Sequence, residues 1–100
     1  MFAKHKPVRD SIYLDWVRSH PCCSCLRPAP SDPHHFMEQG GGTGLKCDDH
    51  FTVPLCRECH MQWHAKGRVG SLDREQSVSA FYKRQAQLLS AWLRQLDQAF

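Results

Sequence analysis

Two Cys-x-x-Cys pairs constrain this chain more than any other feature of its sequence. The first pair is Cys22 and Cys25, and the second is Cys56 and Cys59. A Cys-x-x-Cys turn points two thiolates at one place, and two such turns complete the tetrahedron that Zn²⁺ prefers. Because the pairs are far apart in sequence, the fold has to bring them together, and zinc binding then contributes directly to folding. The sequence therefore predicts a structural zinc site.

The other two cysteines are treated separately. Cys23 adjoins the first pair and is an alternative ligand in place of Cys22 or Cys25, whereas Cys47 is isolated and is interpreted as a free thiol. We find no apolar run of signal-peptide or membrane-spanning length, so a cytoplasmic location is expected. Cysteines in that compartment bind metal more often than they form disulfides. A secreted protein stapled by disulfides is the alternative.

Composition limits the class of protein without naming a function. The chain has 100 residues, 41% of them hydrophobic and 23% charged, which predicts a single globular domain over residues 1–100 rather than disorder. The formal net charge is +3. A mildly basic chain is compatible with a polyanionic partner, but this charge alone does not indicate nucleic acid.

Four histidines accompany the cysteine pairs. His60 and His64 are four residues apart, so on a helix they face the same way and can chelate one ion. His34 and His35 are neighbours, so in an extended segment they face opposite sides. One of them can then bind metal while the other faces a substrate. The alternative is that all four are ordinary surface or loop histidines.

Local patterns predict three helices and two strands. A helix is expected at about 10–19, capped by Asp10 or Ser11, with Ile12 and Trp16 on one face and Tyr13 as a further candidate for that face. Prolines make residues 22–33 a loop. The remaining expectations are a strand near 34–37, a glycine-rich loop at 40–44, a strand at 51–55, a helix from 57 or 58 to a glycine at 67 or 70, and a helix at 73–97.

The last predicted helix is amphipathic. Its apolar residues recur near a period of 3.6, which indicates a core-facing or partner-facing surface. They are Val78, Phe81, Leu88, Leu89, Trp92, Leu93 and Leu96.

The order of these motifs resembles that of the HNH (ββα-metal) endonucleases, and in particular the phage recombination-enhancement (Ref-like) branch. The resemblance covers about residues 10–68. It is carried by Tyr13-Leu14, Trp16-Val17-Arg18, Pro21-Cys22-Cys23, Cys25, Asp32-Pro33-His34-His35, Gly44-Leu45-Lys46, Asp49 and Pro54-Leu55-Cys56-Arg57-Glu58. Nearby members often have His where this chain has Cys59, and either residue ligates zinc.

The resemblance implies an α+β fold: a small zinc-stabilised ββα-metal (HNH) core at about 20–68, with flanking helices at about 10–19 and 73–97. His35 would be the general base, and His34, His60 and His64 would bind a second, catalytic metal. That metal would be Mg²⁺ or Mn²⁺, with Ni²⁺ or Zn²⁺ also possible.

The middle position of the motif is commonly Asn and orients the base, but this chain contains no Asn. Asp49 is the best substitute, followed by Asp48 and His50.

The function implied is that of a metal-dependent DNA endonuclease or nickase, acting in phage DNA metabolism or recombination in the bacterial cytoplasm. DNA would be the main partner, and a recombination or phage protein would deliver it. Four basic residues are candidate phosphate contacts. They are Lys46, Arg57, Lys66 and Arg68. No pattern in the sequence indicates contacts to base edges, so little base specificity is expected. The alternative is a zinc-stabilised nucleic-acid-binding or protein-interaction module without catalysis.

Overall fold

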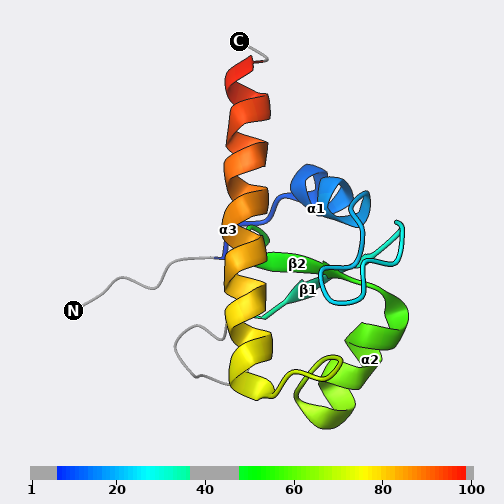
Figure 1. Ribbon diagram of the computed structural model, residues 1–100. Helices are drawn as coiled ribbons and strands as arrows, with labels where there is room; N and C mark the ends of the chain where they lie inside the picture. Colours follow the sequence, from blue (N-terminus) through cyan, green and yellow to red (C-terminus); the bar gives the residue numbers. More distant parts are fainter. Residues whose placement is uncertain (1–6, 37–47, 99–100) are drawn as a thin grey trace, which may run out of the picture.

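Two short antiparallel strands and three helices form an α+β arrangement in the computed structural model, which describes residues 7–36 and 48–98 (Figure 1). The predicted glycine-rich loop at 40–44, Lys46 and Cys47 lie outside these residues. In chain order the elements are α1 (Ser11–Arg18), β1 (Asp32–His35), β2 (Thr52–Leu55), α2 (Arg57–Lys66) and α3 (Arg74–Gln98).

The two strands set the faces of the histidine pair. His34 lies opposite Val53 and is buried, while His35 lies opposite Thr52 and is exposed. The prediction that the two side chains face opposite sides is thus confirmed.

The first strand starts earlier than predicted. β1 begins at Asp32 and includes Pro33, which was assigned to the preceding loop. Pro33 is paired with Pro54 in the register. Residues opposite each other in antiparallel strands alternate between pairs that exchange hydrogen bonds and pairs that do not. Two prolines fit together at a pair of the second kind, where neither N–H is needed.

Helix α1 forms where the sequence predicts it, but its buried side centres on Tyr13 and Val17 rather than on Ile12. Asp10 is its N-cap, and its carboxylate accepts a hydrogen bond of 3.0 Å from the backbone N–H of Tyr13. The predicted buried residue Ile12 is 70% exposed, whereas Tyr13 and Val17 are fully buried. The Tyr13 ring packs edge-on against Trp92 of α3, with centroids 5.3 Å apart. Packing against this distant helix selects the face, and no local sequence window contains that information.

Helix α2 follows β2 directly. Cys56 is its N-cap, and the helix ends at Gly67, which adopts the left-handed conformation with φ +69°. A side chain is strained at that φ, so glycine ends the helix here as the sequence predicts. The short connection fixes α2 against the sheet.

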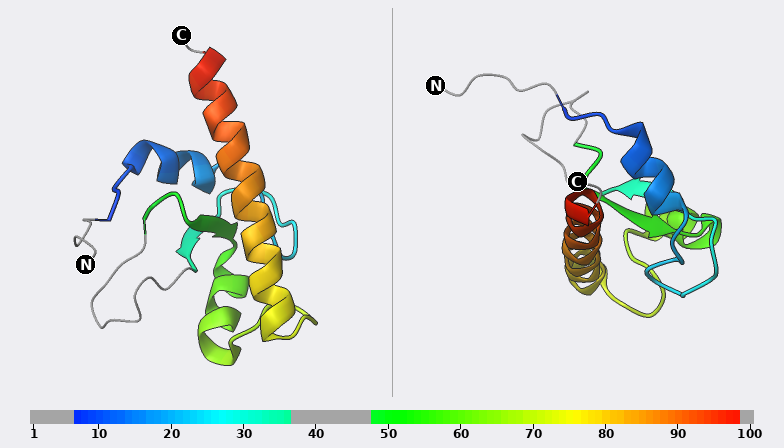
Figure 2. Two further views of the ribbon diagram at one scale, coloured as in Figure 1. Left: turned by 90° about the vertical axis from the view of Figure 1, so that its left-hand side faces the viewer. Right: turned by 90° about the horizontal axis from the view of Figure 1, so that it is seen from above.

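Helix α3 is a single long helix that starts with a reciprocal cap. Asp73 accepts from the backbone N–H of Gln76 at 2.7 Å, and the Gln76 side chain accepts from the Asp73 N–H at 3.0 Å. Its bounds agree with the prediction to within one residue. The N-terminal part runs alongside the sheet, and the C-terminal part extends beyond α1 (Figures 1 and 2). Among the described residues, no helix combines the length and apolarity needed to cross a bilayer.

The core joins the cysteines to apolar residues of β2 and α3. Phe36 and Trp63 pack against it from its edge. The buried members of this core are Cys22, Val53, Leu55, Cys56, Cys59, Val69 and Phe81.

Candidate functional site

The two Cys-x-x-Cys pairs meet in space. The sulfurs of Cys22, Cys25, Cys56 and Cys59 all lie within 4.8 Å of one another. The Cys25 and Cys56 sulfurs, one from each pair, are 3.6 Å apart. Four thiols at this spacing can hold a metal such as zinc, and they tie the loop before β1 to the start of α2.

Backbone N–H groups surround the sulfurs, as the Cys-x-x-Cys turn predicts. The N–H of Cys25 points at the Cys22 sulfur at 3.5 Å, and the N–H of Cys59 points at the Cys56 sulfur at 3.5 Å. Burial opposes ionisation of Cys22, but hydrogen bonds from backbone N–H groups outweigh it and lower the pKa to about 7. This thiol is therefore prepared to bind metal as the thiolate.

Cys23 is not part of the group. Its backbone N–H donates to the carbonyl of Pro54 at 2.8 Å, and its side chain packs against the core. Burial, reinforced by the neighbouring Cys22, raises the Cys23 pKa to about 12. The structure therefore groups Cys22 and Cys25 with the second pair and does not use Cys23 in place of either.

A second cluster consists of three histidines. One ring nitrogen from each of His34, His60 and His64 lies within 4.8 Å of the other two. The i, i+4 pair on α2 thus faces His34 on β1, the grouping that the resemblance implies. The buried Nε2 of His34 has no hydrogen-bond partner among the described residues. An unpartnered buried nitrogen is costly unless something else binds it, so the cluster fits a metal ion.

The protonation of His34 also suits a metal ligand. Burial, together with the neighbouring His60 and His64 imidazoles, lowers its pKa to about 4. The ring therefore stays neutral near pH 7 and keeps a lone pair for an ion.

Asp32 orients one ring of this cluster, a contact that the sequence analysis missed. Its Oδ2 lies 3.3 Å from Nδ1 of His60 and 3.1 Å from Nε of Arg57. A carboxylate on one ring nitrogen leaves the other nitrogen for a metal. The available signal was the strand period, because Asp32 and His34 are two residues apart and share a face.

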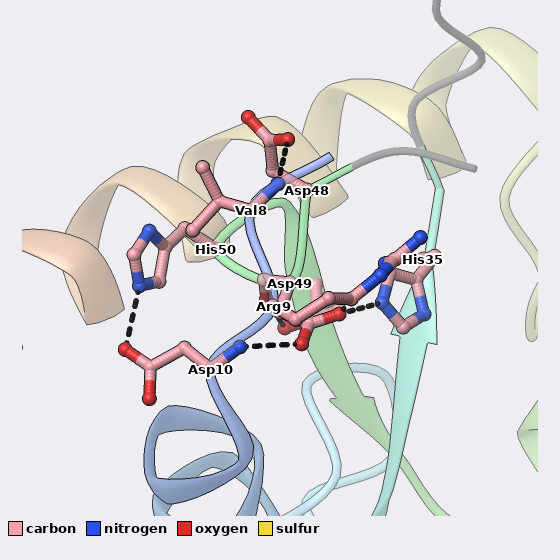
Figure 3. Close-up of polar contacts among 8 residues, drawn as sticks. Val8, Arg9, Asp10, His35, Asp48, Asp49 and His50 are labelled. Atoms are coloured by element: carbon pink, nitrogen blue, oxygen red, sulfur yellow. Dashed lines mark hydrogen bonds and ion pairs between the residues drawn. The ribbon is translucent and has the colours of Figure 1, made fainter. Parts of the chain in front are cut away.

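His35 pairs with Asp49 on the other side of β1 (Figure 3). The His35 Nε2 is 2.9 Å from Oδ1 of Asp49, whose carboxylate also accepts from the Asp10 backbone N–H at 2.7 Å and from Arg9 Nη1 at 3.1 Å. Burial raises the Asp49 pKa, but the hydrogen bonds from His35, Asp10 and Arg9 together hold it below its ordinary value. The carboxylate is therefore ionised, and since it can only accept, we assign the shared proton to His35 Nε2; in a neutral ring of this tautomer Nδ1 is the acceptor.

The two other candidates for the middle position have different partners. Asp48 accepts from the backbone N–H of Val8 at 2.7 Å, and His50 Nε2 lies 3.0 Å from Asp10 (Figure 3). Of the three candidates, Asp49 is the one that the structure brings to His35. Arg9 and the Asp10 backbone N–H hold Asp49 by hydrogen bonds, and no local sequence pattern predicts these long-range contacts.

An open hollow of about 490 Å³ connects the two sets of histidines. Arg74, at the start of α3, lines it and lies over the Trp63 ring, with its guanidinium carbon 5.1 Å from the ring centroid. The sequence analysis did not select Arg74. The lining residues are His34, His35, Phe36, Trp63, His64, Gly67, Arg74 and Val78.

Lys46 lies outside the described residues, and the other three predicted phosphate contacts are not among the residues that line this hollow. Arg57 forms its ion pair with Asp32, Arg68 donates to the carbonyl of Gly70 at 3.1 Å, and Lys66 lines a separate hollow beside Glu58.

Comparison with known proteins places the chain in a family. A family described as "Protein of unknown function (DUF968)" matches residues 2–100, so the chain belongs to it. A relative from Escherichia coli strain K12, "Uncharacterized protein YdfU", is 47% identical over 53 residues. That match covers 52% of this chain and 15% of the relative, so this chain spans a small part of the relative's length. No solved structure matches the chain.

Proposed function

We propose that the protein is a metal-dependent DNA endonuclease or nickase of the HNH type. The observation that supports this most is the use of the two faces of β1. His34 joins a three-imidazole cluster on one face, while His35 is held by an ionised carboxylate on the other. Both histidines line the same hollow. Phosphodiester hydrolysis requires a proton acceptor beside a bound metal ion, and His35 beside the three imidazoles offers residues for both tasks.

The chain's own residues have distinct tasks in this proposal. His35 Nδ1 takes a proton from the attacking water, a role suited to an imidazole near neutral pH. Asp49 acts through His35: it fixes the ring angle and keeps the proton on Nε2. Arg74 supplies a positive charge at the edge of the hollow, where a DNA phosphate would bind.

His34, His60 and His64 would hold the divalent metal, and Asp32 would orient His60. When bound, Mg²⁺ or Mn²⁺ (or Ni²⁺ or Zn²⁺) supplies charge neutralisation for the scissile phosphate and the departing 3′ oxygen. The four-cysteine cluster would hold a structural zinc. The resemblance to phage recombination nucleases extends the proposal to phage DNA metabolism in the bacterial cytoplasm, with a recombination protein that delivers DNA.

The test is cleavage of supercoiled plasmid by wild-type protein and His35→Ala in EDTA, Mg²⁺ or Mn²⁺. We expect metal-dependent nicking by the wild type and its loss in His35→Ala. His50→Ala is a matched control, since His50 pairs with Asp10 rather than with Asp49. Zinc content measured in parallel should stay the same in all three proteins.

The second candidate is a non-catalytic zinc-stabilised binding module, which the cysteine cluster alone favours. The same experiment separates the two when binding of the plasmid is measured beside its cleavage. DNA binding with full zinc content but without cleavage under any metal would replace the nuclease proposal with this module.

A further inference from the structure

Helix α3 carries an apolar stripe that its own domain covers only in part: Tyr82 packs edge-on against Phe36, with ring centroids 5.0 Å apart, and Leu89 is half-buried. From position 82 the stripe residues recur at steps of four and three, which is the heptad spacing of a coiled coil. Tyr82 is 45% exposed, Leu93 55% and Leu96 41%. The full stripe is Tyr82, Ala86, Leu89, Leu93 and Leu96.

This stripe is separate from the core-facing side of α3. Between positions 81 and 96, the residues that the helix buries against its own domain are Phe81, Gln85 and Leu88. At 100° per residue, the centre of the stripe lies about a quarter turn from the centre of that buried side. Leu93 and Leu96 lie outside the face that the helix buries against its own domain, and their exposure gives this part of the seam no intramolecular role.

We propose that the stripe pairs with the same stripe of a second copy of this chain, as an antiparallel two-helix coiled coil. Antiparallel pairing places Leu89 of one copy level with Leu93 of the other, and Ala86 level with Leu96. The small Ala86 side chain opposite the larger Leu96 leaves room for the two helices to approach each other closely. A twofold axis then makes one patch self-complementary, as in a closed dimer.

Charge complementarity supports the second copy as the partner and sets the direction of pairing. Lys83 and Asp97 follow stripe residues directly and flank the seam on the same side. Antiparallel pairing brings Lys83 of each copy to Asp97 of the other, and twofold symmetry makes this contact twice. Along one helix the two residues are about 21 Å apart, so they cannot pair within a chain, and a parallel pairing would keep them apart.

The shape of the protein allows this arrangement. The C-terminal part of α3 extends beyond α1 and the sheet (Figures 1 and 2). Trp92 still packs against Tyr13 and Trp16 of α1, so the paired stretch begins beside α1 and continues into the extension. Antiparallel pairing leaves the two sets of strands, with their cysteine and histidine clusters, at opposite ends of the dimer. The proposal does not depend on nuclease activity.

Sedimentation equilibrium of the zinc-loaded full chain, up to millimolar concentration, tests it. We expect a monomer–dimer equilibrium that Leu93→Glu abolishes. Lys83→Glu and Asp97→Lys should each weaken dimerisation on the order of tenfold, because two attractions become two repulsions. The double variant should restore wild-type affinity.

The control is Lys66→Glu, which makes the same charge change as Lys83→Glu at an exposed position on α2, away from the seam and its flanks. It should leave dimerisation unchanged. A wild type that stays monomeric throughout would overturn the proposal and assign the stripe to a different protein. A dimer whose charge-reversed double variant is no tighter than either single variant would overturn the antiparallel pairing.

Discussion

His35, the last residue of β1, pairs with Asp49, which lies just before β2, with Nε2 and Oδ1 2.9 Å apart. The carboxylate is buried and held by two further donors, so it cannot turn away from the ring. A charged acceptor fixed in this way determines both the orientation and the tautomer of His35.

We expect Asp49→Asn to lower plasmid nicking on the order of a hundredfold, because the amide no longer enforces the Nε2–H tautomer. The pH–rate profile should lose or shift the limb attributed to His35, and ¹⁵N spectra of its ring should show a mixture of tautomers. Asp48→Asn is the matched control, since Asp48 contacts the Val8 backbone instead. Full activity of Asp49→Asn with an unchanged pH profile would remove Asp49 from this role.

The sequence predicts this pair only in part. Strand periodicity places His34 and His35 on opposite faces, and the absence of Asn directs attention to residues 48–50. The fastening of Asp49 comes from Arg9 and Asp10, about 40 residues away, and contacts of that range have no local signature.

The same limit explains the error in α1. Capping by Asp10 is a local property and was predicted correctly. The choice of Tyr13 over Ile12 for burial depends on Trp92 of α3, so it is decided by tertiary packing. Arg74 was missed for a similar reason, because its place over Trp63 requires α2 and α3 to be assembled.

Removing one sulfur should test the structural role of the cysteine cluster. Cys56 is both a member of the cluster and the N-cap of α2. We expect Cys56→Ser to lose stoichiometric zinc and cooperative thermal unfolding, because structural zinc contributes about 10–16 kcal/mol in small domains. Native mass spectrometry and circular dichroism measure the two effects.

Cys23→Ser is the control for this change, since Cys23 adjoins the cluster without belonging to it. It should keep one zinc and lose only about 1 kcal/mol of stability from its partly buried site. Equal zinc loss in both variants would mean that the ligand set differs from the four sulfurs that meet here.

The contact between Asp32 and His60 leads to a prediction about metal affinity. Asp32→Asn should weaken binding of the divalent metal by about 10- to 100-fold, because the ring loses the carboxylate that orients it and raises its basicity. Titration with Co²⁺, followed by its visible absorption, measures this without any cleavage assay. Glu58→Gln is the control, because Glu58 pairs with Arg27 on the surface. Unchanged Co²⁺ affinity in Asp32→Asn would show that the contact has no effect on the metal.

The N-cap of α1 provides a pH test of stability. The Tyr13 backbone N–H, followed by His50, lowers the Asp10 pKa below its ordinary 3.8. The folded state therefore favours the carboxylate, so its contribution is present above pH 3.8 and is lost as the pH falls through the lower folded-state pKa. Asp10→Ala should cost about 1 kcal/mol of unfolding free energy at neutral pH, and the deficit should narrow in acid.

Urea unfolding at a series of pH values measures this difference. Asp15→Ala is the matched control on the same helix, where Asp15 is exposed and pairs only with Arg18 among the described residues. It should cost less than about 0.5 kcal/mol. A deficit for Asp10→Ala that stays constant into acid would show that the carboxylate charge does not contribute.

Arg74 leads to a prediction about DNA affinity. In a His35→Ala background, which prevents cleavage, Arg74→Gln should weaken binding to duplex DNA in the presence of Mn²⁺. The slope of log affinity against log salt should fall by about 0.9, because one phosphate contact is lost. Fluorescence anisotropy at several salt concentrations measures the slope. Arg94→Gln removes the same charge from an exposed position near the other end of α3 and should leave the slope unchanged. Equal slopes for the Arg74 and Arg94 variants would place the phosphate elsewhere and leave Arg74 as a packing partner of Trp63.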